Sequence, residues 1–186
     1  CGPCRGAKPR ACAGRALLLV SGILPSASPF VIRPAREADL PAVLGFIHEL
    51  AAYEKLSHEV AADSDGLRAA LFPSSGPAAA ECVLACVHDQ PAGFALFFPT
   101  YSTFAGKPGL WLEDLYVRPA FRSRGLGTAL LHHVARLANA RGCARMEWAV
   151  LDWNQPAIDV YERLGARRLT DWTTCRLDGP ALAHLV

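Results

Sequence analysis

Apolar residues recur along this chain with two spacings, which predict a mixture of helices and strands. Helical spacing of three to four residues marks 38–53, 64–72, 126–141 and 154–164. Mostly apolar runs bounded by turn-forming residues predict strands at 30–33, 81–87, 90–101, 110–117 and 145–151, and one or two more within 167–177. This order predicts an α/β (α+β) fold, with a mixed, mostly antiparallel central sheet, a βαβ C-terminal half and helices on both faces.

Residues 1–29 differ in pattern from the rest of the chain. Basic residues come first, an apolar stretch follows at 16–24, and Pro and Ser close the segment, an outline that resembles a targeting peptide. The apolar stretch is far shorter than the roughly 20 residues of a membrane span. We therefore expect a disordered extension or targeting-like segment at 1–29 and one folded domain over 30–186.

Composition and charge narrow the possible functions. Hydrophobic residues make up 52% of the 186 residues, enough for a core, and no other stretch suggests a membrane partner. The net charge is +2, but 1–29 carry four basic residues and no acid, which leaves −2 for 30–186. A mildly acidic domain is not typical of nucleic-acid binding and suits a cationic small substrate.

The seven cysteines are scattered along the chain. Cys1 and Cys4 form a lone CxxC without a second pair or a nearby histidine, so no metal site is expected. Free thiols without a disulfide pattern are typical of a reducing compartment, here the cytoplasm.

One stretch, LWLEDLYVRPAFRSRGLGT at 110–128, joins an apolar strand through a glycine-rich turn to a helix. Arg122, Gly125 and Gly127 fit the spacing R-x-x-G-x-G, in which glycines let the backbone approach a phosphate near the helix N-terminus. The lysine of a P-loop and a GxGxxG fingerprint are both missing, which leaves a phosphate site of another kind. The alternative is a glycine-rich turn without a ligand.

A second motif, NQPAIDVYERLGA, begins at Asn154. Asn154 can cap the predicted helix, Pro156 suits its first turn and Gly165 ends it. Asn154 and Tyr161 are seven residues apart, or two helical turns, so both project on the same side. An amide and a phenol can then face one ligand; the alternative is a helix cap plus a half-buried tyrosine.

The two motifs VRPAFRSRGLGTALL and LDWNQPAIDVYERLGA are similar in order and spacing to the GNAT superfamily of acyl-CoA N-acyltransferases, over 30–177. The segments FVIRPA, ELAAYEK and LEDLYV are similar to the diamine (spermidine/spermine) acetyltransferase family and its thialysine-acetylating relatives. The resemblance implies a GNAT-like fold, an N-acetyltransferase that uses acetyl-CoA, and a homodimer.

The resemblance also implies how acetyl-CoA binds. Backbone N–H groups of the glycine-rich turn would hold the pyrophosphate, and the preceding strand would pair with the pantetheine arm as an added strand does. A bulge near Asp114–Leu115 would aim an N–H at the acetyl carbonyl. The implied cofactor-binding residues are Leu115, Tyr116, Val117, Arg122, Ser123, Arg124, Gly125, Leu126, Gly127, Thr128, Asn154, Gln155, Pro156, Ala157 and Tyr161.

Two catalytic groups are implied as well: Tyr161 would protonate the leaving thiolate, and Glu113 would accept a proton from the substrate ammonium. The alternatives are an arginine partner for Glu113 and a fold-stabilising hydrogen bond for Asp114. The implied amine-binding residues are Tyr53, Glu54, Glu113, Asp114, Glu147, Trp148 and Ala149.

The sequence departs from the diamine family late in the chain. An acid that helps to hold the polyamine in that family is lost here or displaced to Asp171, which places long polyamines in doubt. His132 and His133 lack an acidic partner, Cys143 and Cys175 lack an adjacent histidine, and the four tryptophans are expected in the core or at its rim.

We therefore expect acetyl transfer to a small primary amine by direct attack in a ternary complex. The alternatives are acetylation of a protein N-terminus or lysine, a non-catalytic acyl-CoA sensor, and a nucleotide-binding module.

Overall fold

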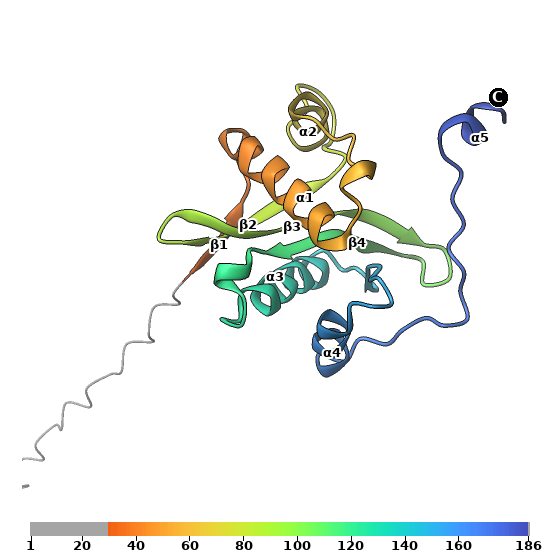
Figure 1. The fold of residues 1–186 in the computed structure, drawn as a ribbon. Helices are drawn as coiled ribbons and strands as arrows, with labels where there is room; N and C mark the ends of the chain where they lie inside the picture. Colours follow the sequence, from red (N-terminus) through yellow and green to blue (C-terminus); the bar gives the residue numbers. More distant parts are fainter. Residues whose placement is uncertain (1–29, 186) are drawn as a thin grey trace, which may run out of the picture.

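The structure, a computed structural model, describes residues 30–185; the expected extension at 1–29 lies outside this range. Its five strands form one sheet in sequence order (Figure 1). The first four pair antiparallel, and the fifth pairs parallel to the fourth. This confirms the mixed, mostly antiparallel sheet. The strands are β1 (Val31–Pro34), β2 (Glu81–Val87), β3 (Gln90–Ser102), β4 (Lys107–Val117) and β5 (Met146–Glu147).

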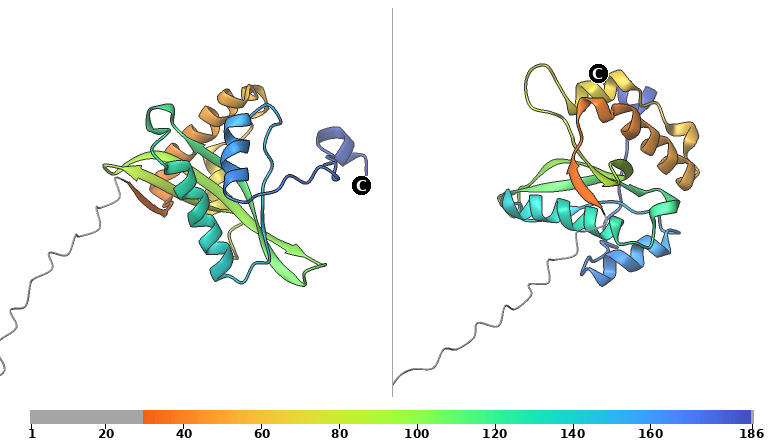
Figure 2. Two further views of the ribbon diagram at one scale, coloured as in Figure 1. Left: turned by 90° about the horizontal axis from the view of Figure 1, so that it is seen from below. Right: turned by 90° about the vertical axis from the view of Figure 1, so that its left-hand side faces the viewer.

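Helices cover both faces of the sheet, as the sequence predicts (Figures 1 and 2). One face carries α1 (Leu40–Glu54) and α2 (Ser64–Leu71), and the other carries α3 (Leu126–Ala140) and α4 (Gln155–Arg163). Short 3₁₀ turns lie at Glu37–Asp39, Ser57–Glu59 and Pro119–Phe121. Because α3 links β4 to the parallel β5, this half is the expected βαβ unit.

The sheet separates two hydrophobic cores. On the α1 side Phe46 stacks on Phe94 of β3, with ring centroids 5.3 Å apart. On the α3 side Leu130 and Val134 pack with Phe97 as fully buried side chains. Burial of such side chains contributes about 1.5–3 kcal/mol each, so both helix layers hold the sheet firmly.

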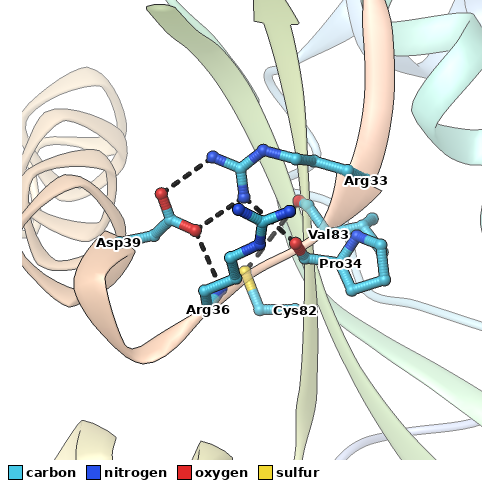
Figure 3. A network of polar contacts seen from close by, with 6 residues as sticks. All are labelled: Arg33, Pro34, Arg36, Asp39, Cys82 and Val83. Atoms are coloured by element: carbon cyan, nitrogen blue, oxygen red, sulfur yellow. Dashed lines mark hydrogen bonds and ion pairs between the residues drawn. The ribbon is translucent and has the colours of Figure 1, made fainter. Parts of the chain in front are cut away.

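A polar network joins β1 to the start of α1 (Figure 3). The guanidinium of Arg33 donates to both carboxylate oxygens of Asp39, at 2.6 and 2.9 Å, and the backbone N–H of Arg36 donates to the same group at 2.8 Å. These bonds hold the pKa of Asp39 below its usual range, with the Arg33 hydrogen bonds as the main cause. The network fixes where α1 leaves the sheet.

Two strand predictions were wrong. The strand expected at 145–151 contains only Met146 and Glu147, and within the described part of 167–177 the chain forms no strand. The segment 145–151 alternates only as far as Trp148, and in 167–177 the apolar Leu169, Trp172 and Cys175 lie three residues apart. A strand also needs a neighbouring edge to pair with. The chain instead runs from α4 as an extended segment to a short helix, α5 (Gly179–Ala183), which stands away from the sheet (Figure 2).

Candidate active site

A β-bulge in β4 is the central feature of the site. Across the β3–β4 pair Asp114 lies opposite Leu96 and Leu112 lies opposite Phe97, so Glu113 is an extra residue without a partner in β3. A bulge was expected near Asp114–Leu115, and the structure has it at Glu113. Such an extra residue locally changes the direction of the strand and its side chains.

The bulge changes which face of the sheet each side chain meets. Leu112 packs in the core on the α3 side, and Leu115 packs against the same core although it lies three positions later, an odd spacing that regular alternation would place on the opposite face. Tyr116 lies in the core on the α1 side, and Asp114, two residues earlier, projects to that side too. The bulge at Glu113 thus lets the two neighbouring acids approach the same region.

Three carboxylates gather where the end of α1 meets this bulge: Glu54, Glu113 and Asp114. Burial, and after it the nearby charges of Glu113 and Glu54, raise the pKa of Asp114 to about 6. Burial also raises the pKa of Glu54. Asp114 forms no hydrogen bond with another side chain of residues 30–185, so the structure offers no support for a fold-stabilising bond there. A half-buried acidic cluster of this kind attracts a cation.

Glu113 itself has a single side-chain partner within residues 30–185. The indole N–H of Trp111 donates to its carboxylate Oε2 at 2.7 Å. The alternative of an arginine partner is not observed among the described ion pairs. The carboxylate is exposed and therefore accessible to a substrate.

Tyr161 projects from α4 and is half-buried. Its ring meets the edge of Trp148, with centroids 5.1 Å apart, so two expected site residues do lie together. Burial, and after it the charge of Glu54, raises the pKa of the Tyr161 hydroxyl. The hydroxyl is therefore protonated at neutral pH and can donate a proton or a hydrogen bond.

The β4–β5 pair opens beside the bulge. The two strands pair only at Leu110 with Met146 and at Trp111 with Glu147. Beyond that point no strand of residues 30–185 pairs with Leu115–Val117 on this side. The exposed backbone edge can therefore hydrogen-bond an extended ligand, as β-strand addition does.

The glycine-rich turn leads into the N-terminus of α3. Ser123 and Gly125 have left-handed backbone conformations, with φ of 59° and 81°. The first turn of α3 leaves the N–H groups of Leu126, Gly127 and Thr128 without intrahelical acceptors. A Cβ added at Gly127 would meet no atom closer than 3.8 Å, so the space beside these donors is open. Donors and open space together fit an anion such as a pyrophosphate.

The two arginines of this turn occupy different places. Arg122 donates from Nε to the carbonyl oxygen of Val117 at 2.8 Å, and its guanidinium lies 4.9 Å from the ring centre of Tyr53. The guanidinium also lies 5.3 Å from the ring centre of Tyr116. Arg122 therefore connects the glycine-rich turn to aromatic side chains on the α1 side of the sheet. Arg124 lies over Phe121 at 5.8 Å and is exposed, which leaves its charge available to an anion.

Asn154 occupies the N-cap position of α4, but its side chain makes no capping bond, so the predicted side-chain cap was wrong. Its Oδ1 instead accepts a hydrogen bond from the hydroxyl of Tyr53 at 3.2 Å. Gln155 bonds Asp159 within the helix at 2.6 Å, while Pro156 lies in the first turn as predicted. Ala157, one turn before Tyr161, is half-exposed.

Two expected amine-binding residues lie apart from the acidic cluster. Glu147 forms an ion pair with Nε of Arg145 at 2.6 Å. Its side chain lines a hollow of about 610 Å³ between the β3–β4 hairpin and 167–172, and Asp171 lines the same hollow. Ala149 is exposed and makes no recorded side-chain contact.

Sequence reasoning missed two tryptophans, which were expected only in the core or at its rim. Trp111 holds Glu113, and Trp153 packs against Tyr53 with ring centroids 5.7 Å apart. The available signal for Trp111 was its position two residues before Glu113 on one strand, which places both side chains on one face before the bulge.

Comparisons with known proteins show the family of this chain. The sequence profile described as "Acetyltransferase (GNAT) family" matches residues 47–166. The chain is 39% identical over 163 residues to a thialysine N-epsilon-acetyltransferase of Mus musculus, covering 83% of this chain and 95% of that protein. It is 32% identical over 194 residues to an L-ornithine N5-acetyltransferase of Arabidopsis thaliana, covering 81% and 85% of the two chains.

Solved structures share the fold. An integron cassette protein from the mobile metagenome of V. cholerae matches with a TM-score of 0.69 and 24% identity, over 84% of this chain and 97% of that one. An aminoglycoside acetyltransferase from a soil metagenome matches with a TM-score of 0.67 and 18% identity, over 82% and 99%. At this identity the likeness concerns the fold alone.

The fold, the glycine-rich turn at a helix N-terminus and the open β4 edge define an acyltransferase. The chain belongs to the GNAT acetyltransferase family and is an N-acetyltransferase. Within residues 30–185 no helix has both the length and the apolar content to cross a membrane.

Proposed function

We propose that this enzyme transfers an acetyl group from acetyl-CoA to the primary amine of a small cationic substrate, such as a diamine, a polyamine or a lysine analogue. The observation that carries the proposal is the acidic cluster of Glu54, Glu113 and Asp114, which adjoins the open edge of β4. The cluster supplies a place for a cation beside the segment that would hold the acyl donor. The thialysine and ornithine acetyltransferases among its relatives, judged by their names, act on amines of this size.

Acetyl-CoA, which supplies the activated thioester, fits three features of the structure. The N–H donors at the start of α3 and the exposed Arg124 would hold its pyrophosphate. The unpaired edge of Leu115–Val117 would hydrogen-bond its pantetheine arm, and the first turn of α4 would contact it from the other side. The space beside Gly127 is open, and a larger side chain at this position would fill it and prevent acetyl-CoA from binding.

Two side chains would then move protons. A lysine-like amine has a pKa near ~10.4 in water and arrives as an ammonium ion, which the acidic cluster attracts. Glu113 would accept its proton through an intervening water molecule, and the free amine would attack the acetyl carbonyl directly. A backbone N–H beside the bulge would stabilise the developing negative charge on oxygen. Tyr161 would donate its proton to the departing thiolate.

Release of free thiol from acetyl-CoA tests the proposal. A panel of diamines, polyamines, lysine, ornithine and thialysine should give saturable rates, with the short diamines and amino acids preferred because the late acid of the diamine family is displaced. Peptides with a free N-terminus or lysine test the protein-acetylation alternative in the same assay. Binding of CoA without turnover of any amine would favour a sensor, and trapping of an acetyl-enzyme would overturn direct attack.

We also propose a cytoplasmic homodimer. The dimer is implied by resemblance to the diamine acetyltransferases, and the compartment is supported by the free state of Cys82, Cys86, Cys143 and Cys175. Sedimentation equilibrium of the purified chain tests the dimer, and fractionation of cells tests the compartment.

A further inference from the structure

Trp111 is one of the two residues of β4 that pair with a strand on each side. Its backbone lies opposite Phe98 of β3 and opposite Glu147 of β5, and it is the last residue of β4 that pairs on both sides. The side chain is half-buried. The two strands on either side therefore fix the direction in which the indole projects.

Glu113, two residues later, is the least constrained position of the same strand. It is the extra residue of the bulge, it has no partner in β3, and its side chain is exposed. A free glutamate at such a position samples many rotamers, and fixing one of them costs side-chain entropy. The indole N–H of Trp111, at 2.7 Å from Oε2, is its one recorded side-chain partner among residues 30–185.

We propose that Trp111 is a positioning residue for the proton acceptor of the reaction. The inference rests on the proposed role of Glu113. An indole N–H donates and never accepts, so it orients one carboxylate oxygen and leaves the second oxygen, Oε1, free to receive the substrate proton.

The charged groups around Glu113 do not replace this contact. Asp114 and Glu54 are acidic neighbours that repel its charge, and Glu147, across the strand pair from Trp111, is occupied by Arg145. Within residues 30–185, Trp111 is thus the one side chain that hydrogen-bonds the Glu113 carboxylate.

A double-mutant cycle tests the inference. Trp111→Phe keeps a flat ring and removes the N–H, and should lower kcat about 10-fold, the scale of one lost hydrogen bond to a charged group, with little change in the KM for acetyl-CoA. Glu113→Gln should lower kcat by more. The double variant should equal Glu113→Gln alone, because Trp111 acts only through Glu113. Trp172→Phe, at a side chain that is 76% exposed, is the matched control and should keep the wild-type rate.

Each outcome has a separate meaning. An unchanged kcat for Glu113→Gln would refute Glu113 as the proton acceptor, and with it the proposed mechanism. A large loss for Glu113→Gln with no loss for Trp111→Phe, or with independent losses that multiply in the double variant, would overturn the role of Trp111 alone. Trp111→Tyr, which keeps an aromatic ring and a donor, should recover part of the rate. Thermal unfolding of every variant separates these effects from loss of the fold.

Discussion

The hydroxyl of Tyr53 donates to Oδ1 of Asn154 at 3.2 Å, across 101 residues of sequence. Tyr53 lies near the end of α1, beside the acidic Glu54, and Asn154 lies at the start of α4. Arg122 of the glycine-rich turn also lies over the Tyr53 ring. Tyr53 thus contacts both proposed cofactor-binding segments, the glycine-rich turn and the start of α4. It does so from α1, the helix that also carries Glu54 of the proposed amine site.

Tyr53→Phe should raise the KM for the amine and for acetyl-CoA several-fold together. The variant keeps the ring beside Trp153 and Arg122 and removes only the link to Asn154. Because the contact is exposed, unfolding free energy should change by less than about 1 kcal/mol. Initial-rate kinetics measure both constants. Tyr101→Phe, at an exposed tyrosine of β3, is the control, and an effect on one substrate alone would refute the coupling.

Tyr161→Phe should lower kcat by roughly 100-fold or more, because the proposed acid loses its proton. Its ring still packs against Trp148, so the affinity for acetyl-CoA should stay the same. Single-turnover rates and calorimetric titration separate chemistry from binding. An unchanged rate would remove Tyr161 from the acid role.

Asp114→Asn should stabilise the fold at pH 8 and weaken amine binding. The pKa of Asp114 is raised to about 6 in the folded protein from 3.8, so folding loses stability as pH rises between these values, and the cost persists above them. Removing the charge should therefore raise the free energy of unfolding by about 1–3 kcal/mol at pH 8. At pH below about 4 the group is protonated in both states, and the two proteins should be equally stable.

Urea unfolding at both pH values measures this difference. A variant that is less stable at pH 8 would instead indicate a fold-stabilising role for Asp114. In kinetics at pH 8 the KM for the amine should rise, because one of three attracting charges is lost.

Gly127→Ala should separate folding from cofactor binding. The added methyl meets no atom closer than 3.8 Å and the φ is not positive, so the helix accepts alanine with no loss of stability. The methyl would enter the space proposed for the pyrophosphate, and the Kd for acetyl-CoA should rise at least about 10-fold, roughly 1.4 kcal/mol. Gly45→Ala in α1, which has no atom within 4 Å of its Cβ, is the matched control.

Asp39→Asn should lower the free energy of unfolding at neutral pH by about 1–3 kcal/mol, because it breaks a double hydrogen bond with Arg33. The pKa of Asp39 is depressed in the folded protein, so its stabilisation is complete above the unfolded pKa near ~3.9 and is lost as pH falls through the folded pKa. The difference between the two proteins should shrink in acid. A difference that is independent of pH would show that packing, not charge, holds α1 to β1.

The local sequence pattern was sufficient to predict those elements whose type and ends are marked within their own residues. The helix expected at 126–141 is Leu126–Ala140, since a glycine-rich start and one apolar face define it without reference to other segments. The segments 145–151 and 167–177 have weaker local patterns, and strand formation also depends on a partner edge that no local pattern contains. The grouping of Glu113 and Asp114 could not be predicted for a similar reason. Simple alternation places these neighbours on opposite faces of the sheet, and only the bulge brings them together.

The bulge at Glu113 shifts the alternation of β4 by one step, and this divides the strand into two segments whose sequences can change independently. Substitutions before Glu113 alter the part of β4 beside the proposed amine site and leave the phase of Leu115–Val117 intact. Deletion of this one residue would make Leu112 and Asp114 neighbours opposite Phe97 and Leu96, which restores regular pairing and leaves Leu115 on the α3 side and Tyr116 on the α1 side. The bulge therefore adds one residue to β4 without exchanging the two cores, and what this residue adds is a second acid beside Asp114.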